Sequence, residues 1–546
     1  MPAFEVRTGI DLHDIQGNIV KGYGRFGFPV ARNILFRVNS EAAGRQFVDA
    51  LRLLITTSAP WTHFGSATEG TKTPSVTTNI AFTFAGLRAV GVPEKSLLSF
   101  PEEFASGMRP RGPILGDDGP SAAANWDPVW RSDEHPQPVH VLVTINAANR
   151  SNLEARYAEI LTILQKVQRA HPTAGSPIGV EQLAGHRDEA GDTALFQDCE
   201  AVTDSKGRPT AKEHFGYTDG ISDPFFRDSG NYPTYVQGGG KRVRGQSPTI
   251  ASGWAPIANG EFILGTVDEA DEYPAAPIPS VLSKNGSFLV LRKLHENVGS
   301  FAKYVAETGA GFGDPELFAA KLVGRWKNGA PLSSFPTRAE ADAFIGELND
   351  ADFGRRDESS TDAKRAAAKA RYYELKQRLM AFDFDTDLEG ARCPVGAHIR
   401  RVNSRSGLEF GVKGAFSTPG ALVNRRRILR RGLPYGRVVD RTRDDGNHGI
   451  IFMAVCASIS RQFEFVQQQW VNYGNDFKLA NDRDPVIGNH PVEGGRMVIE
   501  GDATSGKAPY FCAAIPRFVE TRGGDYFFIP SLTALAAIAG GRIDPT

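Results

Sequence analysis

A histidine in the last third of the chain lies in a segment that could hold a metal cofactor. His398 follows Pro394 and Gly396, and arginines stand two and seven residues behind it, at Arg400 and Arg405. A neutral imidazole can ligate iron, and guanidinium groups can neutralise carboxylates through paired hydrogen bonds. The pattern suits a haem, with the arginines on its propionates. A buried histidine followed by a basic surface strand is the alternative, and spacing alone favours it slightly.

A carboxylate in an apolar setting is the second candidate. Asp219 lies in the segment 215–222, between aromatic and apolar residues, and Gly220 follows it. An Asp-Gly pair is usually only a turn, because glycine tolerates positive φ and aspartate caps neighbouring amides. Apolar neighbours can also remove water from a carboxylate and fit it for proton transfer. The sequence therefore leaves both a turn and a general base open.

A run of arginines is the third candidate. Five arginines occur within residues 425–431, interleaved with Ile428 and Leu429. Such a run can be a basic patch for phosphate or nucleic acid. The apolar residues between the arginines indicate that some guanidinium groups point toward a core, where each needs an anionic partner.

Composition limits the classes of partner. The 546 residues include 62 Lys plus Arg and 63 Asp plus Glu, so no overall charge attracts nucleic acid or an anionic membrane. The four cysteines form no C-x-x-C pair, which indicates neither a disulfide framework nor a zinc site. We expect a small-molecule partner and reduced thiols.

The termini and apolar runs bear on location. Glu5 and Asp11 stand where a signal peptide needs a basic region and then an apolar run. The longest apolar stretch, 532–539, is shorter than the ~20 residues that span a bilayer. We expect no membrane segment and a cytoplasmic protein.

Two α+β halves are predicted to position these candidates. The length favours more than one domain. After Glu200 the sequence becomes rich in Gly, Pro and charged residues, which suggests domains at 1–200 and 201–546. Expected strands are 33–38, 78–84, 139–145, 261–264, 287–291, 449–455 and 526–529, and expected helices are 42–54, 152–169, 296–308 and 460–470. Gly- and Pro-rich loops near 229–256 and a charged, solvated helical insertion near 355–380 interrupt the second half.

Taken in order, the three candidate segments resemble the dye-decolourising peroxidases. The matching motifs are Gly216-x-x-Asp219-Gly220, Ala397-His398-Ile399-Arg400 and Ile428-Leu429-Arg430-Arg431-Gly432-x-Pro434-Tyr435-Gly436. Segments 14–19, 260–265 and 285–290 are also similar to family segments. The first motif alone is weak, but the ordered set is specific. The extended loops resemble the larger, cytoplasmic branch of the family.

The resemblance implies a fold and a set of ligands. The implied fold is α+β, with two ferredoxin-like domains whose antiparallel sheets pack facing each other and one haem b in the second. His398 would be the proximal iron ligand, with Arg400 and Arg405 on the propionates. The second ring nitrogen of His398 should donate to a carboxylate. Asp484 is the candidate for it and Glu464 the reserve.

The resemblance also implies the distal side of the haem and the reaction. Asp219 and Arg430 would act on bound hydrogen peroxide, and Ile450 and Phe452 match distal apolar positions. Donors would be small aromatic molecules or dyes. The family oxidises bulky donors at surface Tyr or Trp residues, and Tyr435 is a candidate relay beside the alternative of an ordinary packed tyrosine.

Two rival functions stay open on the sequence. A haem-binding or haem-transfer protein would use His398 without turnover, but would need neither Asp219 nor Arg430. A nucleic-acid module centred on residues 425–431 lacks stacking aromatic residues and a basic domain charge. The physiological reductant and the choice between monomer and homo-oligomer are not encoded in any recognisable pattern.

Overall fold

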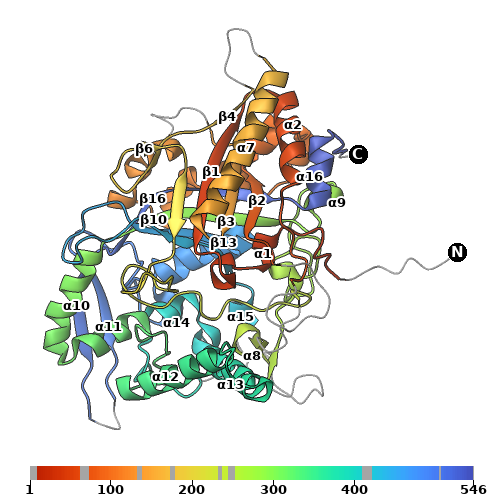
Figure 1. Ribbon diagram of the computed structural model, residues 1–546. Coiled ribbons are helices and arrows are strands. Elements are labelled where there is room, and N and C mark those ends of the chain that lie inside the picture. Colours follow the sequence, from red (N-terminus) through yellow and green to blue (C-terminus); the bar gives the residue numbers. More distant parts are fainter. Residues whose placement is uncertain are drawn as a thin grey trace.

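A computed structural model describes residues 9–61, 73–131, 138–172, 179–230, 236–243, 253–408, 421–502 and 506–544. The chain forms strands in the interior, with long helices at the top and lower edge of the view in Figure 1. Within the described residues, no helix is long and apolar enough to cross a membrane.

The first half of the chain forms an antiparallel sheet with two long helices. In chain order its elements are β1 (Val30–Val38), α2 (Glu41–Arg52), β2 (Val76–Phe82), β3 (Val141–Ala147), α7 (Arg150–Ala170) and β4 (Val180–Gln182). The strand order is β2-β3-β1-β4, and the pairs are antiparallel. This order of elements defines a ferredoxin-like unit. Short helices follow β2, namely α3 (Phe84–Ala89), α4 (Glu94–Leu97), α5 (Glu102–Ser106) and α6 (Gly112–Leu115).

Local sequence explains where the two long helices begin. The side chain of Ser40 accepts a hydrogen bond from Ala43 N at the start of α2, and Asn149 accepts one from Asn152 N at the start of α7. Both are N-caps, which satisfy amides that lack partners in the first turn. From α2, Phe47 is fully buried and packs against Phe36 of β1 at 5.0 Å between ring centroids.

The second half repeats this arrangement. Its strands are β10 (Ser287–Glu296), β11 (Leu429–Arg430), β12 (Leu433–Tyr435), β13 (Gly449–Cys456) and β16 (Val519–Ile529). Their order, β11-β13-β10-β16, matches that of the first half when β11 and β12 are taken as one interrupted strand. The helices between β10 and β11 are α10 (Val298–Phe312), α11 (Pro315–Val323), α12 (Arg338–Gly354), α13 (Asp362–Met380), α14 (His398–Val402) and α15 (Ala421–Asn424). Two π-helical segments, η9 (Ile459–Glu464) and η10 (Val466–Val471), lie between β13 and β16.

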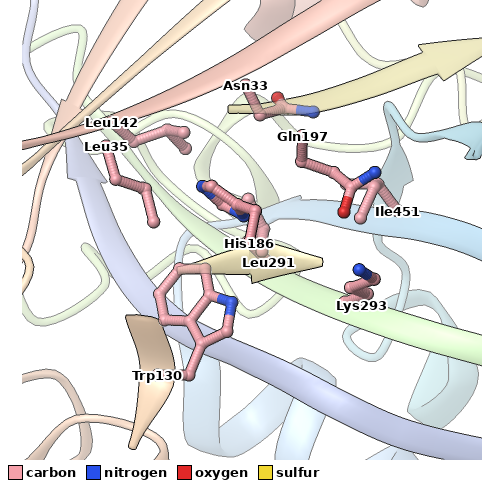
Figure 2. A pocket seen from close by; sticks show the side chains of 9 residues that line it. All are labelled: Asn33, Leu35, Trp130, Leu142, His186, Gln197, Leu291, Lys293 and Ile451. Atoms are coloured by element: carbon pink, nitrogen blue, oxygen red, sulfur yellow. The ribbon is translucent and has the colours of Figure 1, made fainter. Parts of the chain in front are cut away.

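The two halves meet through their sheets, as expected. Leu35 and Leu142 of the first sheet and Leu291 and Ile451 of the second turn toward one small cavity (Figure 2). The facing antiparallel sheets of the α+β prediction are thereby confirmed. The sheets are also joined at one edge, because Phe528 of β16 pairs with Phe82 of β2 to give one ten-stranded sheet.

The domain boundary stays a proposal. We place it near residue 200, because β7 (Gln197–Glu200) is still hydrogen-bonded to β1 of the first sheet. The next elements, α8 (Val236–Gly239), β8 (Lys241–Arg242), β9 (Trp254–Ala255) and α9 (Ser280–Ser283), precede the second sheet. The last helix, α16 (Leu532–Ala539), returns to pack beside α2 (Figure 1).

One strand prediction is wrong. Residues 261–264 form no strand: a 3-10 turn covers Asn259–Glu261, and the chain then turns at Gly265, where φ is +79°. Phe262, Ile263 and Leu264 are nevertheless fully buried. A short apolar run indicates burial but does not separate a strand from a buried turn.

The insertions agree in part with expectation. Helix α13 buries only Leu375, Leu379 and Met380, so most of its surface faces solvent as predicted. It begins at Asp362, with Thr361 as its N-cap, and not near 355. Of the predicted loop at 229–256, residues 231–235 and 244–252 lie outside the described residues.

Candidate active site

His398 is held by a buried carboxylate. It is the first residue of α14, and its Nδ1 lies 2.9 Å from Oδ2 of Asp484. Asp484 is fully buried, and its other oxygen accepts hydrogen bonds from the amides of Val486 and Ile487 at 2.8 and 3.0 Å. A carboxylate fixed in this way accepts a hydrogen bond from Nδ1–H and leaves Nε2 as the nitrogen available to a metal.

The charge of Asp484 is maintained despite its burial. Burial alone would raise the pKa of this carboxyl, but contacts with His398, Arg401 and backbone amides outweigh it, and the pKa lies below its usual value. The reserve candidate, Glu464, is engaged elsewhere: it pairs with Arg111 and accepts a hydrogen bond from Tyr526 at 2.8 Å. The structure thus places Asp484 and not Glu464 beside His398.

Asp219 and Arg430 form an ion pair. Nη1 of Arg430 donates to Oδ1 of Asp219 at 2.5 Å. The Arg430 side chain is 40% exposed and the Asp219 side chain 46% exposed. The charge of Asp219 raises the pKa of Arg430, while exclusion of water by surrounding protein opposes this rise. Both side chains are therefore partly exposed, although nearby protein removes some of the water around Arg430.

Strand register places apolar residues beside Arg430. In β11, Arg430 pairs with Ala454 of β13, so the two side chains leave the same face of the sheet. Because side chains alternate along a strand, Ile450 and Phe452 of β13 share this face, and both are half-buried. Ile451 points to the opposite face and lines the interior cavity. The structure therefore brings Arg430, Asp219, Ile450 and Phe452 to one side of the second sheet.

Arg400 is held by backbone carbonyls and by the carboxylate of Asp387, whose Oδ2 lies 3.7 Å from Nη1. Its guanidinium donates to the carbonyls of Asp387, Cys393 and Leu388 at 2.7, 2.9 and 3.2 Å and lies over the ring of Phe384. Only 1% of Arg400 is exposed. These contacts fix the turn that leads into α14, so the geometry favours a structural role for Arg400 over a contact with a propionate.

Arg405 is buried among other cations. Its Nη atoms donate only to the carbonyls of Met380, Phe382 and Gly238, and its Nε has no partner among the described residues. Burial, followed by the charges of Arg427 and Arg325, holds the pKa of Arg405 well below its usual value.

Arg427 and Arg325 share this environment. Burial lowers the pKa of each to about 10, and no carboxylate lies within salt-bridge distance of either in the described part of the chain. Buried guanidinium groups without an acid need an anionic partner. The cluster of Arg325, Arg405 and Arg427, hereafter the arginine cluster, therefore fits the two carboxylates of a haem.

Sequence reasoning missed Arg325. It follows α11 and donates to Gly329 O at 2.7 Å, and it is 8% exposed. Its pKa responds to Arg430 and Asp219 and also to Cys393, five residues before His398, so it links the two sides of the site. A single arginine between Gly324 and Trp326 gives no sequence signal of this kind.

Tyr435 lies in the interior. It is 1% exposed, Lys293 Nζ stands 4.7 Å from its ring centroid, and its hydroxyl has no hydrogen-bond partner among the described residues. A bulky molecule in solution therefore cannot touch Tyr435, and direct oxidation of a donor on its ring is excluded.

Known proteins resemble this chain in sequence and in fold. The model of the DyP dimeric alpha+beta barrel domain matches residues 14–176. Peroxidase 2 of Mycetinis scorodonius is 26% identical, over 97% of this chain and 87% of its own length. Multifunctional dye peroxidase DyP2 of an Amycolatopsis species is 26% identical, over 96% of both chains. An ancestral D-type dye decolorizing peroxidase has a solved structure that is 25% identical, with a TM-score of 0.67 over 96% of this chain and 98% of its own.

The chain is thus similar to dye-decolourising peroxidases over almost its whole length, and residues 14–176 match their DyP dimeric alpha+beta barrel domain. The matched domain covers the first ferredoxin-like unit, and the whole-chain matches extend over the second unit, which carries His398, Asp219 and Arg430. This peroxidase thus has the enzyme class and the fold that its motifs indicated.

Proposed function

We propose that this peroxidase binds one haem b through His398, reduces hydrogen peroxide and oxidises one-electron donors such as dyes and phenols. The observation that carries the proposal is the 2.9 Å contact between His398 Nδ1 and Asp484, which leaves Nε2 free to ligate iron. The arginine cluster supports it, because buried cations without an acid suit two propionates.

Bound haem would supply the redox centre that takes up the oxidising power of peroxide and passes it on one electron at a time. The protein's own part is to hold and orient this group. Asp484 keeps the His398 ring in one orientation and makes the ligand more electron-rich. The arginine cluster neutralises the carboxylates at the other end of the site.

The distal pair would handle the protons of peroxide. Asp219, paired with Arg430 at 2.5 Å, would accept a proton from one peroxide oxygen and donate it to the other, while the two electrons for cleavage of the O–O bond would come from a haem held by His398. Arg430 stabilises negative charge on the departing oxygen. Ile450 and Phe452 keep this side of the site apolar, which strengthens both interactions.

The distal pair also separates this function from haem storage. A carrier protein needs an iron ligand but neither a proton shuttle nor a fixed cation. The Asp219–Arg430 pair therefore favours turnover over storage. The cytoplasm stays our proposed location, supported by four buried cysteines that are all free thiols.

A visible spectrum of the purified protein tests the proposal. The expected result is a Soret band that is largely lost in His398→Ala and retained in His171→Ala, which removes a histidine of the first unit that contacts Gln46. A His398→Ala variant with full haem occupancy and an unchanged spectrum would overturn the ligand assignment.

A further inference from the structure

Two buried carboxyls lie behind the segment that carries Asp219. Glu213 stands six residues before Asp219, and Glu296 is the last residue of β10. They are 8% and 3% exposed. Neither takes part in the proposed chemistry, and no lysine or arginine forms a salt bridge with either one within the described ranges. Because burial of a charged acid is costly, two buried acids without a paired cation must be stabilised in some other way.

Glu213 organises the loop that leads to Asp219. Its two carboxyl oxygens accept hydrogen bonds from the amides of Phe215 and Tyr217, each at 2.6 Å. Its own amide donates to Tyr217 O at 3.1 Å, and its carbonyl accepts from Gly216 N at 3.0 Å. Residues 213–217 thus form a closed turn around one side chain, immediately before Asp219.

Glu296 ties this turn to the second sheet. Its Oε2 accepts a hydrogen bond from His214 N at 3.3 Å, and its carboxyl is hydrogen-bonded to that of Glu213. Its own amide donates to His448 O at 3.2 Å, which anchors the end of β10. The position of the Asp219 loop relative to the sheet therefore depends on a contact between two acids.

This contact requires a proton. Two carboxylates in dry surroundings repel each other, so one must be protonated for a hydrogen bond to form. Both oxygens of Glu213 already accept amide protons, which makes Glu296 the donor. Burial raises the pKa of Glu213 to about 7 and that of Glu296 well above its usual value. The charge of Asp219 adds to both shifts and that of Glu213 adds to the shift of Glu296, whereas the hydrogen bonds that Glu213 accepts oppose the rise in its own pKa.

The neighbouring groups do not supply a compensating charge. His214 and His448 adjoin the pair, and burial lowers the pKa of both, to about 4 for His214, so each is neutral near pH 7. Tyr217 and Tyr435 are buried and neutral, because burial raises the pKa of each. The cation Arg441 reaches only the carbonyl of His214, at 2.8 Å.

We propose that the Glu213–Glu296 pair, carrying one shared proton, is the positioning device that holds Asp219 in place for reaction with peroxide. Loss of the proton puts two negative charges side by side in the interior and releases the loop. The inference rests on the catalytic role proposed for Asp219 and adds two positioning residues that need not touch peroxide or haem.

Paired substitutions at Glu296 separate geometry from charge. Glu296→Gln keeps a donor for Glu213 and an acceptor for His214 N, and so imitates the protonated acid at every pH. Glu296→Leu has a similar volume but neither group. The holoenzyme carrying Glu296→Leu should react with peroxide on the order of tenfold to a hundredfold more slowly, and Glu296→Gln should recover most of that loss.

The pH profile gives the sharper result. The wild-type rate of reaction with peroxide should fall at alkaline pH, where Glu296 loses the shared proton, whereas the Glu296→Gln rate should stay level over the same range. An identical alkaline fall in both proteins would overturn the proposal, as would a Glu296→Leu variant with the wild-type rate and profile.

Hydrogen exchange tests the positioning without turnover. In a peptide spanning residues 211–222, exchange corrected for its intrinsic pH dependence should be faster in Glu296→Leu than in the wild type, and Glu296→Gln should restore protection. If the amides of residues 211–222 are protected equally in Glu296→Leu and in the wild type, the positioning role is contradicted.

The combination of Glu296→Leu with Asp219→Asn separates this inference from the function on which it rests. If Glu296 acts through Asp219, the double variant should be no slower than Asp219→Asn alone. An Asp219→Asn variant with the wild-type rate would remove the catalytic role of Asp219 and with it the proposed effect on rate, while the exchange data would still report whether Glu296 holds the loop.

Discussion

Asp219 and Arg430 are separated by 211 residues in sequence, yet their side chains are paired at 2.5 Å. Asp219 comes from a loop that Glu213 closes, and Arg430 comes from a short strand whose register on β13 is fixed by backbone pairing. The base and the cation thus come from two independent elements. Either side chain can therefore be replaced without disrupting the element that carries the other.

The distal pair gives the first prediction. Asp219→Asn removes the base and should slow the reaction with peroxide by roughly 10²–10⁴-fold. Arg430→Leu removes the cation and should slow the same step by roughly 10²–10³-fold. Stopped-flow absorbance after mixing with peroxide measures both. Wild-type rates in both variants, with haem bound, would favour a haem carrier over a peroxidase.

Asp484 gives the second prediction. Asp484→Asn leaves a side chain of the same shape but removes the charge that orients His398, so haem affinity should fall about 10–100-fold. Haem transfer to an acceptor protein measures this loss. Glu464→Gln is the matched control, because Glu464 pairs with Arg111 and not with His398. Equal weakening in the two variants would argue against the proximal role of Asp484.

The arginine cluster gives the third prediction, in which stability and haem binding move in opposite directions. Arg427→Met removes a buried charge whose Nε has no partner among the described residues. The haem-free protein should therefore become more stable, by about 1–3 kcal/mol. Haem binding should weaken, because a partner of the propionates is lost. Calorimetry of the haem-free protein and haem titration measure the two effects, and a change in the same direction in both would contradict the assignment.

Tyr435 gives the fourth prediction. Its hydroxyl is buried without a partner among the described residues, so Tyr435→Phe should leave stability unchanged or raise it. Because a bulky donor cannot reach a side chain that is 1% exposed, turnover of dyes and of small phenols should change by the same factor. A selective loss with dyes would instead indicate that electrons pass through this ring on their way from the surface.

The dependence of stability on pH gives the fifth prediction. Burial raises the pKa of Glu500 to about 7 and that of Asp525 to about 6. A raised folded-state pKa gives stability that is present at acid pH and lost as pH rises through that value. Burial lowers the pKa of His186 to about 3 and that of His490 to about 4. Their unfolded forms bind protons below about pH 6.5, so stability is also lost as pH falls from there.

The two acids and the two histidines therefore act in opposite directions between about pH 4 and pH 7. Calorimetry between pH 4 and pH 9 measures the balance, and Glu500→Gln should remove the loss of stability that Glu500 contributes between about pH 4.5 and pH 7, which is at most a few kcal/mol. A slope over this range that is identical in wild type and Glu500→Gln would contradict the shift assigned to Glu500.

Periodicity and motif order predicted most of the fold and the main site. The strands at 33–38 and 139–145 are local patterns; the first lies within β1, and the second overlaps β3 over residues 141–145. His398, Asp219 and Arg430 sit in short motifs that a single sequence displays. The failed strand at 261–264 shows the limit of periodicity, because burial of Phe262 and Ile263 in a turn leaves the same apolar pattern as a strand.

The supporting contacts could not be predicted in this way. Glu213 and Glu296 are 83 residues apart, and they meet only because the turn at 213–217 packs against the end of β10. Arg325 lies in no recognisable motif, and only the cations around it indicate its role in the site. Arg400 matches the family motif, but the carbonyls that occupy its guanidinium become visible only in three dimensions.

The pairing of Phe528 with Phe82 has a consequence for synthesis of the chain. The outer edge of β2 finds its partner in β16, which is the last strand to leave the ribosome. Once β7 is made, the first unit must therefore wait with an open sheet edge while about 320 further residues are translated, and unpaired edges of this kind invite aggregation. A nascent chain of this peroxidase should accordingly depend on a chaperone until its final strand is made.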